Sequence, residues 1–482
     1  MADSESRKPI TRRDRRNRSP VLLYGILFSV LLFLINLAKP TFTDFLHNRV
    51  YDSLLSAHTG KPSSVPVIVD IDEKSLKQYG QWPWPRYRIA ILMDKLRNLG
   101  ALSIGLDMLF AEEDRTSLHS IRREILHDFG VDLGFREVPQ GLRDNDQRLA
   151  EALSRGPLLL GYQFLFEEGS DSEDCLLHPL RVNKIGHDKA ERDPPLFIHA
   201  RSVSCNLKMF SEAAAGSGFF NVSPDSDGIL RRVPLIIEHG GKLYPSLGLI
   251  TLMNALGVRE VLLKIDTSGV EALYLNQTAV PLTSKGSMLI RFRGKGKTFD
   301  YVSAADILSD RIPDGKIRGK IVFVGTSASG LKELKSTPFD PVFPGVEVHA
   351  TVVDNILKKD FLSRPKWAAG LESVGMLLLG LLSAFILAWT GARWSSLFLG
   401  VVAAGVWQAS AWMFRNEGIF ISPVLPLIVL ACNFSLITFF RFWQEEKRVK
   451  ERTHELAMVQ EATIESMSSA DRNAGSGYRW AH

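Results

Sequence analysis

The chain has 482 residues, of which 45% are hydrophobic, and its formal net charge is only +5. The excess basic residues lie at the two ends of the chain, which indicates membrane topology and contact with anionic lipid, and we expect no nucleic-acid partner. Three cysteines are too few for a disulfide scaffold, and the length allows one large or two small soluble units beside apolar segments.

The first apolar run covers residues 21–38 and follows a basic segment, residues 1–20. It is longer than the roughly 7–15 residues of a signal-peptide core, so we interpret it as an uncleaved membrane anchor. Three further runs near the end of the chain have lengths that suit a bilayer: residues 367–389, 394–414 and 419–440. The sequence therefore predicts four transmembrane helices.

Basic residues cluster before the first run and after the last one. Because positive residues favour the cytoplasmic side, both termini are predicted to be cytoplasmic. Residues 40–366 then form an extracytoplasmic domain of a multi-pass membrane protein.

Residues 40–366 show the pattern of an α/β domain. Residues 65–72, followed by a helical segment at 87–99 and a second apolar run at 101–110, predict a strand, a helix and a parallel strand joined by a right-handed crossover. We expect further strands at residues 157–166 and 321–325, helices at 144–155 and 344–357, and antiparallel segments at 218–238 and 287–293. The predicted fold is a mixed sheet flanked by helices, with an exposed, loop-like insertion near residues 168–206.

Two cysteines, Cys175 and Cys205, lie in this domain, where oxidation is permitted. Their spacing alone leaves open whether they form a disulfide. The third, Cys432, lies in the last apolar run and is interpreted as a packing residue.

Acidic residues follow the first two predicted strands. Asp70 and Asp72 end the first strand, and Asp107 ends the second. If these strands are adjacent, Asp72 and Asp107 meet at one edge of the sheet, where open α/β folds hold ligands, and they attract a cation or cationic ligand. Alternatively, the acids cap helices and tether the Trp-Pro-Trp-Pro-Arg segment at residues 82–86, with Arg86 paired to one of them.

Two other features are candidate ligand contacts. The small hydroxylated residues after the strand at 321–325, above all Thr326 and Ser327, offer backbone N–H groups to an anion but lack the lysine of a phosphate-binding loop. His349 is interpreted as a residue with a local hydrogen bond.

The two tryptophans at 82 and 84 are expected to fill the core. We predict no catalytic residue, no metal site and no cofactor.

Five segments resemble one known family in order and spacing, over residues 42–365: VIVDIDEKSLKQYGQWPWPR, GALSIGLDMLF, SPDSDGILRRVPLII, KIVFVGTSASGLKELKSTP and PGVEVHATVVDNIL. They are similar to the extracytoplasmic CHASE sensor domain of the second type, found in bacterial membrane receptors. Such receptors have an anchor, the sensor, three closing spans and a cytoplasmic output domain. Glu333 departs from this pattern, which has an aspartate there.

Residues 441–469 predict a cytoplasmic signalling helix that pairs as a coiled coil, and residues 470–482 an unstructured tail. The segment LAMVQEATIESMSS is similar to the first helix of HD-GYP cyclic di-GMP phosphodiesterases, but the sequence stops before any catalytic motif of that domain. We therefore expect a homodimeric, non-enzymatic receptor for an unidentified extracytoplasmic ligand, with its output domain missing from this chain. The alternatives are a phosphodiesterase fragment, an enzyme acting outside the cytoplasm, or a membrane scaffold.

Overall fold

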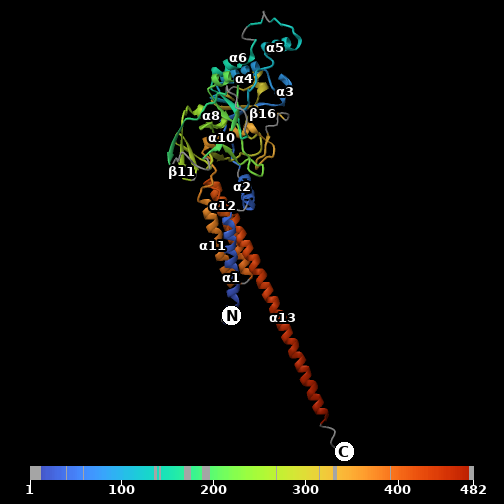
Figure 1. Ribbon diagram of the computed structural model, residues 1–482. Helices are drawn as coiled ribbons and strands as arrows, with labels where there is room; N and C mark the ends of the chain where they lie inside the picture. The colour runs from blue at the N-terminus through green and yellow to red at the C-terminus, as the bar shows by residue number, and fades with distance from the viewer. Residues whose placement is uncertain are drawn as a thin grey trace, which may run out of the picture. The chain divides into compact units, whose positions relative to one another are not determined.

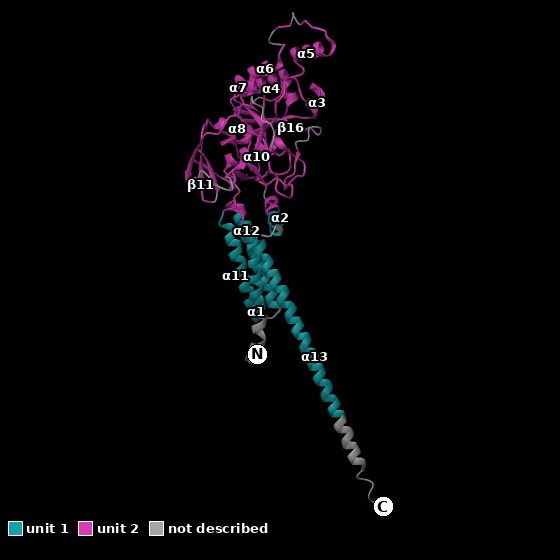
Figure 2. Cartoon of the chain, in the orientation of Figure 1, with its two compact units in different colours: residues 1–50, 366–413, 421–482 teal, residues 51–365, 414–420 magenta. Residues whose placement is uncertain are grey.

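The structure is a computed structural model, and it describes residues 12–38, 41–57, 59–134, 138–139, 143–167, 175–186, 196–267, 269–313, 315–328, 334–390 and 392–476. It divides into two compact units (Figure 2). The helical unit comprises Met1–Val50, Lys366–Met413 and Ile421–His482, and the α/β unit comprises Tyr51–Pro365 and Phe414–Phe420.

The α/β unit is built on a seven-stranded sheet with the strand order β15-β1-β16-β2-β3-β6, in which β7 also pairs with β3. All pairs are parallel except β3 with β6. The strands are β1 (Pro66–Ile71), β2 (Ser103–Leu106), β3 (Leu158–Leu165), β6 (Ser202–Ser204), β7 (Gly216–Phe219), β15 (Asp300–Ser303) and β16 (Ile321–Thr326). Strands β1, β2 and β16 are buried along almost their whole length, as their continuous apolar sequences require.

Helices cover both faces of this sheet (Figure 1). One face packs against α4 (Arg86–Asn98), α6 (Asn145–Ser154) and α9 (Ala304–Leu308), and the other against α8 (Leu247–Leu256) and α10 (Gly345–Lys358). The remaining helices of this unit are α3 (Glu73–Tyr79), α5 (Leu118–Phe129) and α7 (Lys208–Ala213). The main core lies between the sheet and α4 and α6, and Trp84 fills part of it as predicted, with 1% of its surface exposed.

Smaller sheets complete the α/β unit: β10-β9-β5, β13-β12-β11-β4, β14-β8 and β17-β18. Their strands are β4 (Val182–Gly186), β5 (Ile198–His199), β8 (Arg232–Pro234), β9 (Ile236–His239), β10 (Lys242–Pro245), β11 (Val261–Asp266), β12 (Gly269–Leu275), β13 (Thr278–Pro281), β14 (Ser287–Leu289), β17 (Leu334–Lys335) and β18 (Phe343–Pro344). A disulfide joins Cys175 to Cys205, which answers the question that the sequence left open.

The helical unit contains α1 (Arg12–Leu37), the start of α2 (Thr41–Ser56), α11 (Ala368–Trp389), α12 (Ala392–Asn416) and α13 (Val424–Ser476). Three described helices are long and apolar enough to cross a membrane, in the segments Ala368–Trp389, Arg393–Asn416 and Val424–Ile464. A fourth helix of sufficient length and apolarity is found only if two segments joined by a sharp bend are counted as one span, namely Leu22–Leu37 and Phe42–Ser56. The fourth span therefore remains a prediction. The side-chain amide of Asn433 ties α13 to α1 and α11 through Ser29, Ser383 and the carbonyl of Gly380, at 2.9–3.0 Å.

The expected mixed sheet flanked by helices is confirmed, and the predicted strands and helices lie within a few residues of the observed ones. The condition for Asp72 and Asp107 to meet is not fulfilled: β1 and β2 are parallel but not adjacent, because β16 lies between them. Residues 287–289 pair antiparallel with β8 as predicted, whereas β7, at the start of the segment 218–238, is parallel to β3.

Three boundaries also differ. The described part of the insertion at 168–206 contains strands β4, β5 and β6 rather than only loop. The last apolar run becomes helical only at Val424, since Pro423 and Pro426 suit the first turn of a helix better than its interior, and Ile419 instead pairs with Ser363. Helix α13 continues to Ser476, so residues 470–476 are helical where an unstructured tail was expected. Residues 329–333, including Glu333, lie outside the described residues.

Gly105 allows α8 to lie close to the middle of the sheet. A Cβ atom at this position would lie 2.7 Å from Oγ1 of Thr251 and 3.0 Å from the ring of Phe323. We therefore expect Gly105→Ala to lower the free energy of unfolding by about 1–3 kcal/mol, because a buried strand has no room to move aside. Thermal unfolding of the full chain in detergent measures this effect. Gly134→Ala is the matched control, since its added Cβ meets nothing within 4 Å; equal melting temperatures for the two variants would contradict the packing argument.

Candidate functional site

The carboxyl ends of β1 and β16 bring two of the predicted site residues together. Asp70 is buried, and its carboxylate accepts hydrogen bonds from the backbone N–H of Ser327 at 2.9 Å and from the Ser327 hydroxyl at 2.5 Å. Thr326 lies opposite Ile71 in the register of the two strands. Burial raises the pKa of Asp70, although the bonds from Ser327 oppose that change. The Asp70 carboxylate thus occupies the N–H group of Ser327 that the sequence offered to an anion.

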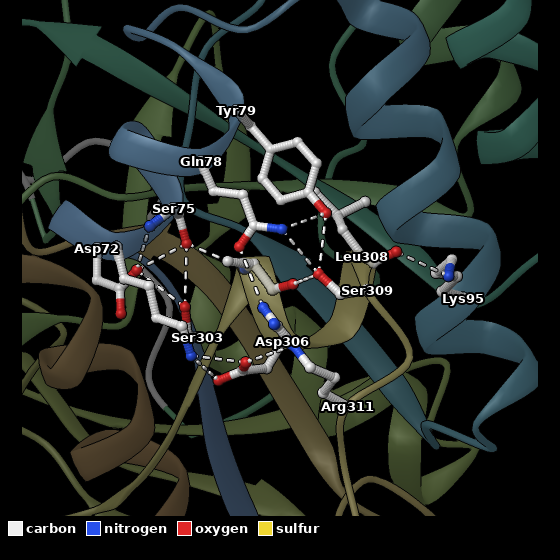
Figure 3. A network of polar contacts seen from close by, with 12 residues as sticks. Asp72, Ser75, Gln78, Tyr79, Lys95, Ser303, Asp306, Leu308, Ser309 and Arg311 are labelled. Atoms are coloured by element: carbon white, nitrogen blue, oxygen red, sulfur yellow. Dashed lines mark hydrogen bonds and ion pairs between the residues drawn. The ribbon is translucent and has the colours of Figure 1, made fainter.

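Asp72 is a helix cap. Its carboxylate accepts from the N–H of Ser75 at 2.8 Å, from the Ser75 hydroxyl at 2.7 Å and from the Ser303 hydroxyl at 2.9 Å. The Ser75 hydroxyl oxygen in turn accepts from the N–H of Ala305 at 3.0 Å, at the start of α9. Figure 3 shows how this network joins α3 to α9 and continues through Tyr79 and Ser309. The alternative reading, in which the acids cap helices, is therefore confirmed for Asp72.

Asp107 lies at the end of β2, two strands away from β1. Since neighbouring strands are about 4.8 Å apart, the intervening β16 separates Asp72 from Asp107 by roughly 10 Å across the sheet. The carboxylate of Asp107 instead lies 3.6 Å from Nε2 of His349, which is buried on α10 and stacks against the ring of Phe323. The expectation that His349 makes only a local contact is wrong, because α10 crosses the sheet near the end of β2.

Arg86 does not pair with Asp70, Asp72 or Asp107, so this prediction is also wrong. Its side chain packs over the ring of Phe110, with its Nε atom 3.8 Å from a carboxylate oxygen of Asp146. Its backbone N–H, the first of α4, donates to Asp114 at 2.8 Å. Helix α4 packs on α6, and this places Arg86 beside the start of α6 rather than at the end of β1.

The sequence analysis missed Glu347, which is fully buried in the first turn of α10. Its carboxylate accepts from the N–H groups of Lys297 at 2.7 Å and Thr298 at 3.0 Å, and from the hydroxyl of Tyr301 at 2.8 Å. Burial raises the pKa of Glu347, and burial together with the Glu347 carboxylate raises the pKa of Tyr301. An acid inside the apolar pattern of residues 344–357 was the available signal.

A second missed cluster is centred on Arg231, whose side chain is 2% exposed. Its guanidinium binds Asp52 of α2 at 2.7 Å, Asp225 at 3.0 Å and Asp227 at 2.8 Å. Burial lowers the pKa of Arg231, but the hydrogen bonds that its guanidinium donates to Asp52 and Asp227 outweigh this effect, and the pKa lies above its ordinary value. The signal was the run SPDSDGILRR, in which two arginines follow two aspartates.

Three segments distant in sequence form a packed cluster in the α/β unit, which we call the junction: Tyr51, Ser363 and Phe414–Phe420. The ring of Tyr51 packs edge-on against Phe414 and Phe420, with centroids 5.6 and 5.2 Å apart. The backbone of Ser363 donates to Gly418 at 2.8 Å and accepts from Phe420 at 2.9 Å. Gly418 has φ +66°, and a Cβ there would collide with the carbonyl oxygen of Phe361, so this close approach requires glycine.

The α/β unit also has a small open cavity of about 280 Å³ at the starts of α5, α6 and α7. Its lining is polar and of mixed charge: Glu113, Ser117, His119, Ser120, Arg123, Asp144, Asp146, Leu207, Lys208 and Met209. None of the six residues predicted as ligand contacts lines it. Within the described residues no group of three or more His, Cys, Asp or Glu side chains is arranged to hold a metal ion.

These features define a folded α/β domain joined to apolar helices, with buried carboxylates at the strand ends. The CHASE2 domain model matches residues 26–388, well over half of the 482 residues, and the chain therefore belongs to the CHASE2 family. This is a family of extracytoplasmic sensor domains and not of catalytic ones. The comparisons with curated proteins and with solved structures found no match.

The burial of Asp70 predicts a pH dependence of stability. Since its pKa is raised above the ordinary 3.8, the folded chain holds the proton where the unfolded chain has lost it. The stabilisation that this bound proton gives to the folded chain is complete below pH 3.8 and is lost as the pH rises through the raised pKa of Asp70. Asp70→Asn removes the titration, while its amide still accepts from the N–H of Ser327 and donates to the hydroxyl.

We therefore expect the melting temperature of Asp70→Asn, relative to that of the wild type, to increase between about pH 4 and pH 8. Melting curves of both full-length proteins across this range measure the difference, in which every titration that they share cancels. A difference that stays constant with pH would show that Asp70 is not protonated in the folded state.

Proposed function

We propose that this chain is a transmembrane receptor whose α/β unit senses a stimulus outside the cytoplasm and whose membrane helices relay it inward. The three apolar helices, and the bent pair of α1 and α2 as a fourth span, support this arrangement, as do the basic residues at both ends. The proposed site is the carboxyl edge of the sheet with Asp70, Asp72, Asp107, Thr326 and Ser327. Arg86 lies away from this edge, at the start of α4 and beside Asp146 of α6, so its contribution to ligand binding comes from there.

The observation that carries the proposal is the junction. Tyr51 lies on α2, soon after α1; Ser363 lies shortly before α11; and Phe414–Phe420 joins α12 to α13. All the connections from the α/β unit to the apolar helices therefore meet in one packed cluster. A rearrangement of the domain that moves this cluster changes the constraints on every span at once.

Helix α10 links the candidate site to the junction. Its first turn holds Glu347 and His349 near the strand ends, and Asp354 near its other end pairs with the buried Arg293 at 2.6 Å. Asn355 bonds both backbone groups of Arg291, at 2.9 and 3.0 Å, and the guanidinium of Arg291 donates to the carbonyl of Phe414 at 3.2 Å. This helix of 14 residues is about 20 Å long, so it supplies a rigid connection between the two places.

Helix α13 provides the exit route. It runs without interruption from Val424 to Ser476, and Val449, Leu456 and Val459 are exposed along its second half. We propose that these apolar side chains pair with a second copy as a coiled coil and pass the signal to an output domain outside this chain. An HD-GYP phosphodiesterase domain is the candidate for that output, and a scaffold that binds partners through α13 is the alternative.

The membrane arrangement predicts opposite results for reporters at different positions. Alkaline phosphatase inserted after Gly130, in an exposed turn of the α/β unit, should be active, because the enzyme needs the oxidising periplasm. Green fluorescent protein fused after residue 482 should fluoresce, because that end is cytoplasmic. The same two reporters exchanged between the positions are the controls. Phosphatase activity at the C-terminal position alone would overturn the proposed topology.

The relay predicts that the junction sets the output. In a chimera with a diguanylate cyclase joined after residue 469, Phe420→Leu should change basal cyclase activity by roughly 2–10-fold, because an edge-on aromatic pair contributes about 0.5–1.5 kcal/mol. Phe129→Leu is the matched control, since Phe129 is 76% exposed and remote from the junction in sequence. Equal activity of the two variants, at equal expression and melting temperature, would contradict the relay.

A further inference from the structure

Helix α12 is the least covered of the three apolar helices near the end of the chain. Only 17% of its most apolar segment is buried, against 39% for those of α11 and α13. One side of α12 is covered: Leu399 packs against the cluster of Ala384, Leu387 and Ile437, Thr390 shares a hydrogen bond with Ser395, and the Ser410 hydroxyl donates to the carbonyl of Ile421. The middle of α12 therefore presents a broad face that the rest of the helical unit does not cover.

An amide side chain lies on this uncovered face. Gln408 is exposed in the second half of α12, two residues before Ser410, and makes no hydrogen bond with any described residue. Asn433, by contrast, donates to three groups inside the helical unit. In a hydrocarbon environment the amide of Gln408 has no solvent to bond, and lipid tails provide neither donors nor acceptors.

Small residues lie on the same side of the helix. Gly400, Ala404 and Gln408 are four residues apart, so they share one face. A Cβ added at Gly400 would meet no atom within 4 Å, so no element in the described part of the chain packs against this position. Small residues at this spacing let the backbones of two membrane helices approach closely.

We propose that this α12 face, defined by Gly400, Ala404 and Gln408, is the surface on which a second copy of the chain docks. A glutamine amide is both donor and acceptor, so two identical side chains related by a two-fold axis satisfy each other, which makes a second copy the natural occupant. Both copies insert in the same orientation, and residue 404 of one therefore faces residue 404 of the other. The inference rests on the proposed membrane placement of α12 and names the partner in that receptor.

Disulfide cross-linking in native membranes tests this interface. In a Cys432→Ser background, Ala404→Cys should cross-link to a dimer under mild oxidation. Val406→Cys, two residues along and on the opposite side of α12, is the control at the same depth and should remain monomeric. Equal cross-linking at the two positions, or a product whose mass is not twice that of the chain, would overturn the proposed interface.

The role of the amide is tested in the same assay. Adding Gln408→Leu, which keeps the bulk and removes the amide, should reduce cross-linking at position 404 by about threefold or more, and Gln408→Asn should restore most of it. Unchanged cross-linking with leucine would overturn the role of Gln408.

A membrane-impermeant maleimide separates this inference from the proposed function. Protection of both cysteines from the reagent is the result expected for a helix within the bilayer. Reaction of both would overturn the membrane placement of α12 and the inference with it, whereas protection without selective cross-linking at position 404 would overturn the interface alone.

Discussion

A strand from late in the chain lies in the middle of the sheet, and the rest of the α/β unit depends on its hydrogen bonds. β16 pairs with β1 on one side and β2 on the other, although some 215 residues separate it from β2 in sequence. Without it, two buried strands would each leave a row of backbone groups unpaired, at a cost of about 1–3 kcal/mol for each buried group. The pairing of β16 with β1 also places Ser327 within hydrogen-bond distance of Asp70.

Several acids near the strand ends and helix starts serve mainly as internal hydrogen-bond acceptors. Asp72 caps α3, Asp114 accepts from the first N–H of α4, and Glu347 accepts from a loop and a tyrosine. Each of these groups would attract a ligand if it were free, but here each satisfies backbone groups of the fold itself. Any ligand bound at this edge must therefore compete with existing bonds, and that competition is a means of changing the structure.

The sequence predicted the local elements well because apolar periodicity and capping residues act over short ranges. Residues 65–72 and 87–99 are examples, since each is specified by its own side chains. Adjacency was harder to predict: nothing near Asp72 or Asp107 indicates that β16 separates them. The partners of His349 and Arg86, and Asp52 as a partner of Arg231, were missed for the same reason, since each of these contacts joins segments that only the tertiary fold brings together.

A stimulus changes the junction only if it binds two arrangements of the domain with different affinity. Helix α10 supplies a physical basis for such a difference, because its two ends are fixed by different interactions. At one end the carboxylate of Glu347 accepts a hydrogen bond from the hydroxyl of Tyr301, and His349 lies beside the buried carboxylate of Asp107. At the other end Asp354 is held by Arg293 in a fully buried pair, where breaking one partner costs about 3–5 kcal/mol. In the relay that we propose, the Arg293 end therefore moves with the helix rather than separating from it, so that a shift of α10 at the strand edge is passed on to the junction.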